Sequence, residues 1–276
     1  MNYAFNSPVV LKKLRAIATG TTSVAAIYNK DLFQIKLKTP SLTEQTKIAN
    51  FLTAVDEKIT QLTQKHDLLT QYKKGVMQQI FSQELRFKDD DGKEFPEWEA
   101  ALIGERINEK SAKFNPDKQS YFMKCIELEH LSQNTGELLG HTDTSTSKSI
   151  KNKFEKGDVL FGKLRPYLKK YLKAPFSGVC STEIWVLKGR GISNEYLFQF
   201  VQTESFVTQT NISSGSKMPR ADWGVVSCAY SYFPCPEEQI KIANFLTAID
   251  DKITVTQTQL KVVKQYKQGL LQQMFV

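Results

Sequence analysis

The sequence lacks the patterns that define several common protein classes. It has no run of about eighteen apolar residues, so we expect no membrane-spanning segment. The first fourteen residues include Pro8, Lys12 and Lys13 and no apolar core before small residues, so we expect no export signal and a cytoplasmic protein. The motifs GxxxxGK[ST], GxGxxG and HExxH are absent as well, and we therefore predict that the chain is not an enzyme.

Cysteine and histidine are scarce. The chain has three histidines and four cysteines without CxxC spacing, at Cys125, Cys180, Cys228 and Cys235. No histidine lies near a cysteine in a spacing typical of a metal site, so we expect reduced core thiols and no bound metal. Glu183 lies inside an apolar run, but no second acid or base at a useful spacing supports a catalytic role.

Basic residues exceed acidic ones, 37 to 29, which gives a formal charge of +8 and favours a polyanionic partner. Most of this excess lies in residues 145–173, where nine basic residues face two acidic ones. Tyr167 and Tyr171 lie among the lysines, next to charges that could neutralise phosphate. The run alone fits a solvated surface as well as it fits a nucleic-acid interface.

An internal repeat is the strongest signal. Residues 44–81 align with residues 238–275 without a gap, and 21 of the 38 positions are identical. The best-matching blocks read EQTKIANFLTAVDEKIT from Glu44 and EQIKIANFLTAIDDKIT from Glu238. Chance does not produce such a match, so the chain contains two copies of one element.

Each copy has the apolar spacing of a coiled coil. Positions that alternate by fours and threes predict two long helices, each about 57 Å long at about 1.5 Å per residue. A stripe this narrow needs a partner helix, and the periodicity alone also fits a plain helical hairpin. The predicted interface consists of Ile48, Leu52, Val55, Ile59, Leu62, Leu69 and Val76 in the first copy and Ile242, Leu246, Ile249, Ile253, Leu260, Val263 and Leu270 in the second. His66 and Lys73 also fall on the stripe, and we expect them to extend toward solvent.

The pattern of residues 96–237 predicts a domain of strands and helices, in the α+β class, between the two long helices; we call it the mixed domain. Strands are expected at 121–127, 159–162 and 178–187, and a helix at 194–210. Residues 82–95 contain Gly92 and predict a linker, and residues 1–43 weakly resemble the end of the mixed domain. We therefore divide the chain into 1–43, the helix 44–81, the linker 82–95, the domain 96–237 and the helix 238–276.

Two segments of the mixed domain are candidate DNA contacts. In the basic run, we predict phosphate contacts from Lys163, Arg165, Lys169 and Lys170. The second segment is a loop of small hydroxyl residues with two cations, which suit phosphate oxygens or a guanine edge, and its predicted contacts are Ser214, Ser216, Lys217 and Arg220.

A series of motifs resembles one family. PEWEAALIGE from Pro96, GDVLFGKLRPYLKKY from Gly157, GVCSTEIWVL from Gly178, the SGSKMPRADW loop and the PEEQIKIANFL start of the second helix follow one another. In this order they resemble a specificity (S) subunit of a type I restriction-modification system. The resemblance implies target recognition domains that read double-stranded DNA and two helices that pack antiparallel as a spacer between half-sites. It also implies docking of methyltransferase (M) and restriction (R) subunits, with S-adenosylmethionine, ATP and magnesium bound by those partners.

The chain departs from the family pattern at its start. A full member has two complete recognition domains, whereas residues 1–43 resemble only the end of the first one. We expect an inactive fragment, a half-site binder, or a subunit that pairs with a second S chain, and we favour the third as a hypothesis. A non-catalytic coiled-coil adaptor without sequence-specific DNA binding is the alternative from another class.

Overall fold

The computed structural model describes residues 8–21, 24–35, 40–118, 122–146, 149–212 and 218–274. The chain divides into two compact units. Unit 1 consists of Met1–Lys73 and Ile249–Val276, and unit 2 is Lys74–Ala248. In the described ranges, no helix has the length and apolar character that crossing a membrane requires.

Two long helices dominate the secondary structure, α4 at Leu42–Phe81 and α9 at Pro236–Met274. Neither contains an internal proline, and the proline of α9 occupies the first position, where no backbone hydrogen bond is lost. At the start of α4, Ser41 Oγ accepts a hydrogen bond from the backbone N–H of Glu44 at 3.3 Å. After α4, Gln83 adopts a left-handed conformation with φ of 63°, which ends the helix.

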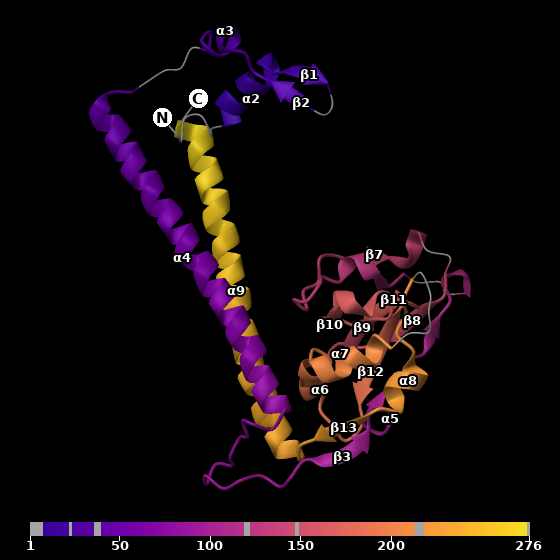
Figure 1. Cartoon of the computed structure of the whole chain (residues 1–276). Coiled ribbons are helices and arrows are strands. Elements are labelled where there is room, and N and C mark those ends of the chain that lie inside the picture. The colour runs from indigo at the N-terminus through magenta and orange to yellow at the C-terminus, as the bar shows by residue number, and fades with distance from the viewer. Residues whose placement is uncertain are drawn as a thin grey trace. The chain divides into compact units, whose positions relative to one another are not determined.

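In unit 1, the first part of α4 and the last part of α9 run antiparallel (Figure 1). Lys73 Nζ lies 2.6 Å from Asp250 Oδ1, and Lys267 pairs with Asp56. The two ion pairs are the same contact made twice, because Asp56 and Asp250 are equivalent in the repeat, as are Lys73 and Lys267. Burial lowers the pKa of Lys73, which was expected to extend into solvent, and the nearby Asp250 carboxylate opposes this shift.

The N-terminal part of unit 1 contains four short elements. These are α2 at Pro8–Ile17, strands β1 at Thr19–Thr21 and β2 at Val24–Ala26, and α3 at Asn29–Leu32. The two strands pair antiparallel, with Thr19 opposite Ala26.

The described residues of unit 2 form three sheets and four short α-helices, so that the chain is α+β, as predicted. One sheet has the order β10–β9–β12–β4, formed by Tyr171–Lys173, Val159–Gly162, Ile184–Gly189 and Ile107–Asn108. A second has the order β5–β8–β11–β6–β7, formed by Lys113–Phe114, Lys151–Phe154, Gly178–Ser181, Lys124–Ile126 and Thr142–Asp143. The third pairs β13, Tyr230–Phe233, with β3, Glu99–Leu102. Strands β11 and β6 are parallel, and the other neighbouring strands of these three sheets are antiparallel.

Helices α6 at Asn194–Phe200 and α7 at Glu204–Thr210 replace the single helix expected over 194–210. Thr203 accounts for the break, because its Oγ1 accepts a hydrogen bond from the N–H of Phe206 and donates one to the carbonyl of Phe200. The other two helices are α5 at Ile103–Arg106 and α8 at Trp223–Ser227.

The apolar run 178–187 also forms two elements instead of one strand. Strands β11 and β12 belong to different sheets, and the chain crosses between them at residues 182–183. The hydroxyl of Ser181 accepts a hydrogen bond from the N–H of Glu183 at 3.3 Å, which is typical of a turn. Both strands are buried, so the run stays apolar although its direction changes.

The two repeat-related ion pairs predict an internal comparison of stability. Asp250→Asn should lower the free energy of unfolding by about 1–3 kcal/mol, because Lys73 has only 12% of its side chain exposed and keeps a charge without a full partner. Asp56→Asn should cost less than about 1 kcal/mol, since that pair is more exposed, with 36% of Asp56 accessible. Chemical denaturation of both variants checks the order, and an equal loss would contradict it.

Candidate nucleic-acid interface

The loop between β9 and β10, residues 163–170, carries the four cations predicted to contact phosphate; we call it the basic loop. A single 3-10 turn at Pro166–Leu168 forms its tip, flanked by Arg165 and Lys169 in left-handed conformations with φ of 51° and 46°. Such conformations cost energy for residues other than glycine, and surrounding bonds must hold them in place.

Backbone hydrogen bonds join the basic loop to the second candidate segment. Arg165 N–H donates to the carbonyl of Pro219 at 2.8 Å, and Ala221 N–H donates to the carbonyl of Lys163 at 2.9 Å. Lys163 N–H in turn donates to the carbonyl of Glu183 at 2.8 Å. Three segments far apart in the sequence therefore meet at one corner of unit 2.

Two cations of the basic loop, Lys163 and Arg165, make no side-chain hydrogen bond or ion pair with any described residue. Arg165 is exposed and Lys163 is half-buried, and Tyr167, two residues after Arg165, is 53% exposed. An exposed guanidinium beside an exposed phenol can bind a phosphate oxygen and stack or hydrogen-bond next to it.

The other two cations of the basic loop are held by the protein itself. Lys169 Nζ lies 2.6 Å from a carboxylate oxygen of Glu204, and Lys170 Nζ donates to the carbonyl of Leu128 at 2.6 Å. Their capacity to neutralise phosphate is therefore lower than that of Lys163 and Arg165.

Arg220 pairs with a carboxylate that sequence analysis left without a partner. Its Nε lies 2.9 Å from Glu183 Oε2, while 62% of the Arg220 side chain remains exposed. The ion pair holds one edge of the guanidinium near Glu183 and leaves the other edge available for a ligand. The sequence shows Glu183 as a carboxylate inside an apolar run, but its partner could not be found by spacing because it lies 37 residues further along the chain. The other predicted contacts of this segment, Ser214, Ser216 and Lys217, lie outside the described residues.

The positive charge of residues 145–173 is partly neutralised in the folded chain. Lys151 pairs with Glu127 at 2.6 Å, and Lys173 pairs with Glu195 at 2.7 Å, which lowers the pKa of the Glu195 carboxyl. Lys153 lies over the ring of Phe114. Acidic residues from other parts of the chain thus neutralise several lysines, and exposed positive charge remains at the corner formed by the basic loop and Arg220.

The four cysteines are free thiols. Burial raises the pKa of Cys125 to about 12 and also raises the pKa of the buried Cys180, so both stay protonated at neutral pH. Within the part of the chain that the structure describes, no group of three acidic, histidine or cysteine side chains is placed to hold a metal ion.

The predicted helix stripe divides into buried and half-buried positions. The buried side chains are Leu52, Leu62, Val76, Ile242, Leu246, Ile249 and Leu260. The half-buried ones are Ile48, Val55, Ile59, Leu69, Ile253, Val263 and Leu270.

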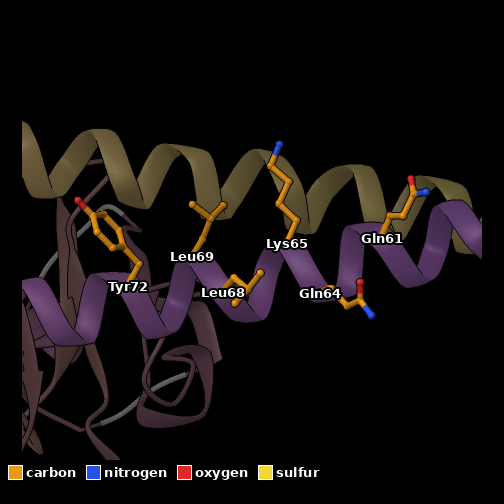
Figure 2. Close-up of a pocket in the computed structure, with 6 residues that line it drawn as sticks. All are labelled: Gln61, Gln64, Lys65, Leu68, Leu69 and Tyr72. Carbon is orange, nitrogen blue, oxygen red and sulfur yellow. The ribbon is translucent and has the colours of Figure 1, made fainter.

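Beside the stripe, the two helices carry exposed apolar side chains at equivalent positions of the repeat. Leu68 and Val262 are 65% and 56% exposed, and Tyr72 and Tyr266 are each 54% exposed. Figure 2 shows a shallow pocket on α4 lined by Gln61, Gln64, Lys65, Leu68, Leu69 and Tyr72. We call Leu68 with Tyr72 and Val262 with Tyr266 the two helix patches.

Comparison with known proteins gives one consistent family. Residues 3–71 and 101–265 match the family model described as "Type I restriction modification DNA specificity domain". The MjaVIII specificity subunit of Methanocaldococcus jannaschii is 23% identical over 98% of this chain and 68% of its own length. The EcoDI specificity subunit of Escherichia coli is 24% identical over 76% of this chain. The chain spans about two thirds of the first relative and 53% of the second.

Solved structures share the fold. The S subunit of a type I restriction-modification system from M. genitalium aligns with a TM-score of 0.63 at 17% identity, covering 99% of this chain and 71% of that one. A chain from a study of "complex assembly" and "conformational transition of the type I R-M system" aligns with a TM-score of 0.54 at 16% identity, covering 98% of this chain and 68% of that one. Since the family model covers most of its residues, the chain belongs to the family of type I restriction-modification DNA specificity domains.

Proposed function

We propose that the chain reads one half of a bipartite double-stranded DNA target. The observation that carries this proposal is the corner of unit 2 where Arg165 and Tyr167 are exposed, Lys163 is half-buried, and backbone hydrogen bonds bring Arg220 alongside. Phosphate contacts position a protein on DNA, whereas contacts to base edges give specificity. We assign the first role mainly to Lys163 and Arg165, with smaller contributions from Lys169 and Lys170, and the second role to Arg220.

The long helices are proposed to act as a spacer and as a docking surface. Two methyltransferase subunits would bind the two helix patches, one at Leu68 and Tyr72 and one at Val262 and Tyr266, and restriction subunits would bind through them. The equivalence of the patches in the repeat supports this stoichiometry. In this proposal the chain itself is non-catalytic and acts in the cytoplasm, and S-adenosylmethionine, ATP and magnesium bind to the partner subunits. A second S chain would supply the other reader.

Replacing Lys163 or Arg165 in the basic loop should weaken binding to all DNA sequences alike. Lys163→Gln and Arg165→Asn, the latter chosen because asparagine tolerates a left-handed conformation, should each lower the salt slope of duplex binding by about one. The measurement is a titration of labelled duplex at several salt concentrations. Lys156→Gln is the matched control, because this exposed lysine lies at the opposite end of the β9–β10 pair. Unchanged binding of both loop variants would place the phosphate contacts elsewhere, whereas a parent chain without salt-dependent duplex binding would favour the adaptor.

Arg220→Gln should remove discrimination at one base position, at a cost of about 1–3 kcal/mol. Affinity selection from random duplexes, with a methyltransferase subunit present, should recover a half-site with the parent chain and the same half-site less one base with the variant. Glu183→Gln should weaken the same position to a smaller extent, because it loosens the guanidinium without removing it. If Arg220→Gln weakened binding to all sequences equally, Arg220 would be a phosphate contact. If the parent chain selected no sequence, the proposal that it reads a half-site would be wrong.

The two helix patches should each hold one methyltransferase subunit. Native mass spectrometry of the co-purified complex should show two such subunits with the parent, one with either Leu68→Asp or Val262→Asp, and none with the double variant, since a charge cannot be buried there without a partner. Leu85→Asp, at a position that is 41% exposed and lies outside both helices, should leave the stoichiometry unchanged. Two bound subunits in the double variant would place docking elsewhere.

A further inference from the structure

The two copies of the repeat begin with the same residues in different surroundings. Three identical side chains lie along one face of each helix, at the first, fourth and eighth positions of the copy. We call each set a seat: the first seat is Glu44, Lys47 and Phe51, and the second seat is Glu238, Lys241 and Phe245. Side chains from one continuous segment of the chain, residues 86–98, contact the second seat.

Glu238 is the centre of the second seat. Its side chain is fully buried, and Arg86 binds it with Nε and Nη2 at 3.0 and 2.9 Å. Trp98 Nε1 donates a third hydrogen bond at 3.0 Å. Hydrogen bonding to Glu238 raises the pKa of Arg86, and the same guanidinium donates to the carbonyl of Pro96 at 2.6 Å. A bidentate arginine and an indole donor thus satisfy a carboxylate that water does not reach.

The other two members of the second seat contact the same segment. Lys241 Nζ lies 2.7 Å from Asp90 Oδ1 and 5.8 Å from the centre of the Phe95 ring. The rings of Phe245 and Phe87 meet edge to face at 5.5 Å. The segment 86–98 therefore matches the seat in charge and in shape.

The first seat has no such occupant among the described residues. Glu44 and Lys47 are exposed, and Phe51 is 42% exposed. The backbone N–H of Glu44 donates to Ser41 Oγ, and the Glu44 carboxylate has no hydrogen bond or ion pair with any described residue.

The helix itself has the same local structure at both seats. Gln45 Nε2 donates to the carbonyl of Pro40 at 2.8 Å, and Gln239 Nε2 donates to the carbonyl of Pro234 at 2.9 Å. The two seats therefore differ in what covers them and not in how their helix begins.

We propose that the first seat is a docking site for a second polypeptide segment with the pattern of residues 86–98, carried by another chain of the specificity type. The occupant must present an arginine to Glu44, an aromatic ring to Phe51 and an acidic side chain to Lys47, with a tryptophan that reaches the same carboxylate. Among the described residues, the segment 86–98 has this pattern, and it already contacts Glu238. The inference rests on the repeat and does not depend on DNA binding.

A labelled peptide of residues 84–98, added to the whole chain, tests the docking site. Fluorescence anisotropy should show saturable binding at one site per chain. Glu44→Gln should weaken binding by about tenfold or more, because the charge-assisted bidentate pair is lost. Glu57→Gln, at an exposed glutamate of the same helix, is the matched control and should bind like the parent. A peptide with Arg86→Gln should bind as weakly as the parent peptide binds to Glu44→Gln.

Attaching the segment covalently to the chain makes the test independent of how tightly the free peptide binds. Residues 82–98 appended after Phe275 would follow the second copy of the repeat as they follow the first in the native chain. Hydrogen exchange of residues 44–51 should then slow about tenfold or more, and Glu44→Gln should abolish the protection. If neither the peptide nor the tethered segment protects these residues, or if Glu44→Gln changes nothing, the proposal is wrong. Displacement of the peptide by duplex DNA or by a methyltransferase subunit would assign the surface to that ligand and would also overturn it.

Discussion

The buried carboxylate of Glu238 constrains the organisation of unit 2. A carboxylate without access to water costs several kcal/mol unless charged or polar donors surround it, so Arg86 and Trp98 must lie where Glu238 lies. Trp98 immediately precedes β3, which pairs with β13, and β13 leads into α9 within three residues. The carboxylate thus joins the beginning and the end of the mixed domain at the first turn of the second long helix. The basic loop belongs to a domain whose two ends are tied together.

In unit 1 an ion pair between a lysine and an aspartate occurs twice, because the first copy of the repeat packs against the second. When two copies of a helix pack antiparallel, a contact between one position of the first copy and another position of the second recurs with the roles exchanged. Asp56 with Lys267 and Lys73 with Asp250 are this pair of contacts. The arrangement explains why a lysine interrupts the apolar stripe of each copy. A shift of the helices by one heptad would leave both lysines without their aspartates, so the ion pairs select the register as well as stabilise it.

Sequence reasoning succeeded where the signal was local and failed where it depended on contacts across the fold. The long helices and strand β9 follow from periodicity and burial, and the structure gives β9 the predicted bounds of Val159–Gly162. The run 178–187 could not be divided by periodicity, since both of its strands are buried and only the turn at Glu183 separates them. The break at Thr203 did carry a local signal, a threonine followed by glutamate and serine, which is typical of a helix start. Counting charges along the chain also could not find Glu204, which lies 35 residues from Lys169 and reduces the charge of the basic loop.

The candidate interface combines two segments whose relative position is set by backbone bonds and not by side chains. Arg165 and Ala221 donate hydrogen bonds across the contact, so the loop that carries Lys163 and the segment that carries Arg220 cannot move independently without losing them. The left-handed conformations at Arg165 and Lys169 add to this restriction. Their unfavourable conformational free energy is already included in the folded state, so no ligand has to supply it on binding. A protein that reads sequence needs its phosphate contacts and its base contacts at a fixed separation, since the first set the register in which the second are tested. Backbone hydrogen bonds keep this separation fixed even when individual side chains of the corner are replaced. A side-chain replacement can therefore change which base is selected without moving the phosphate contacts that give affinity.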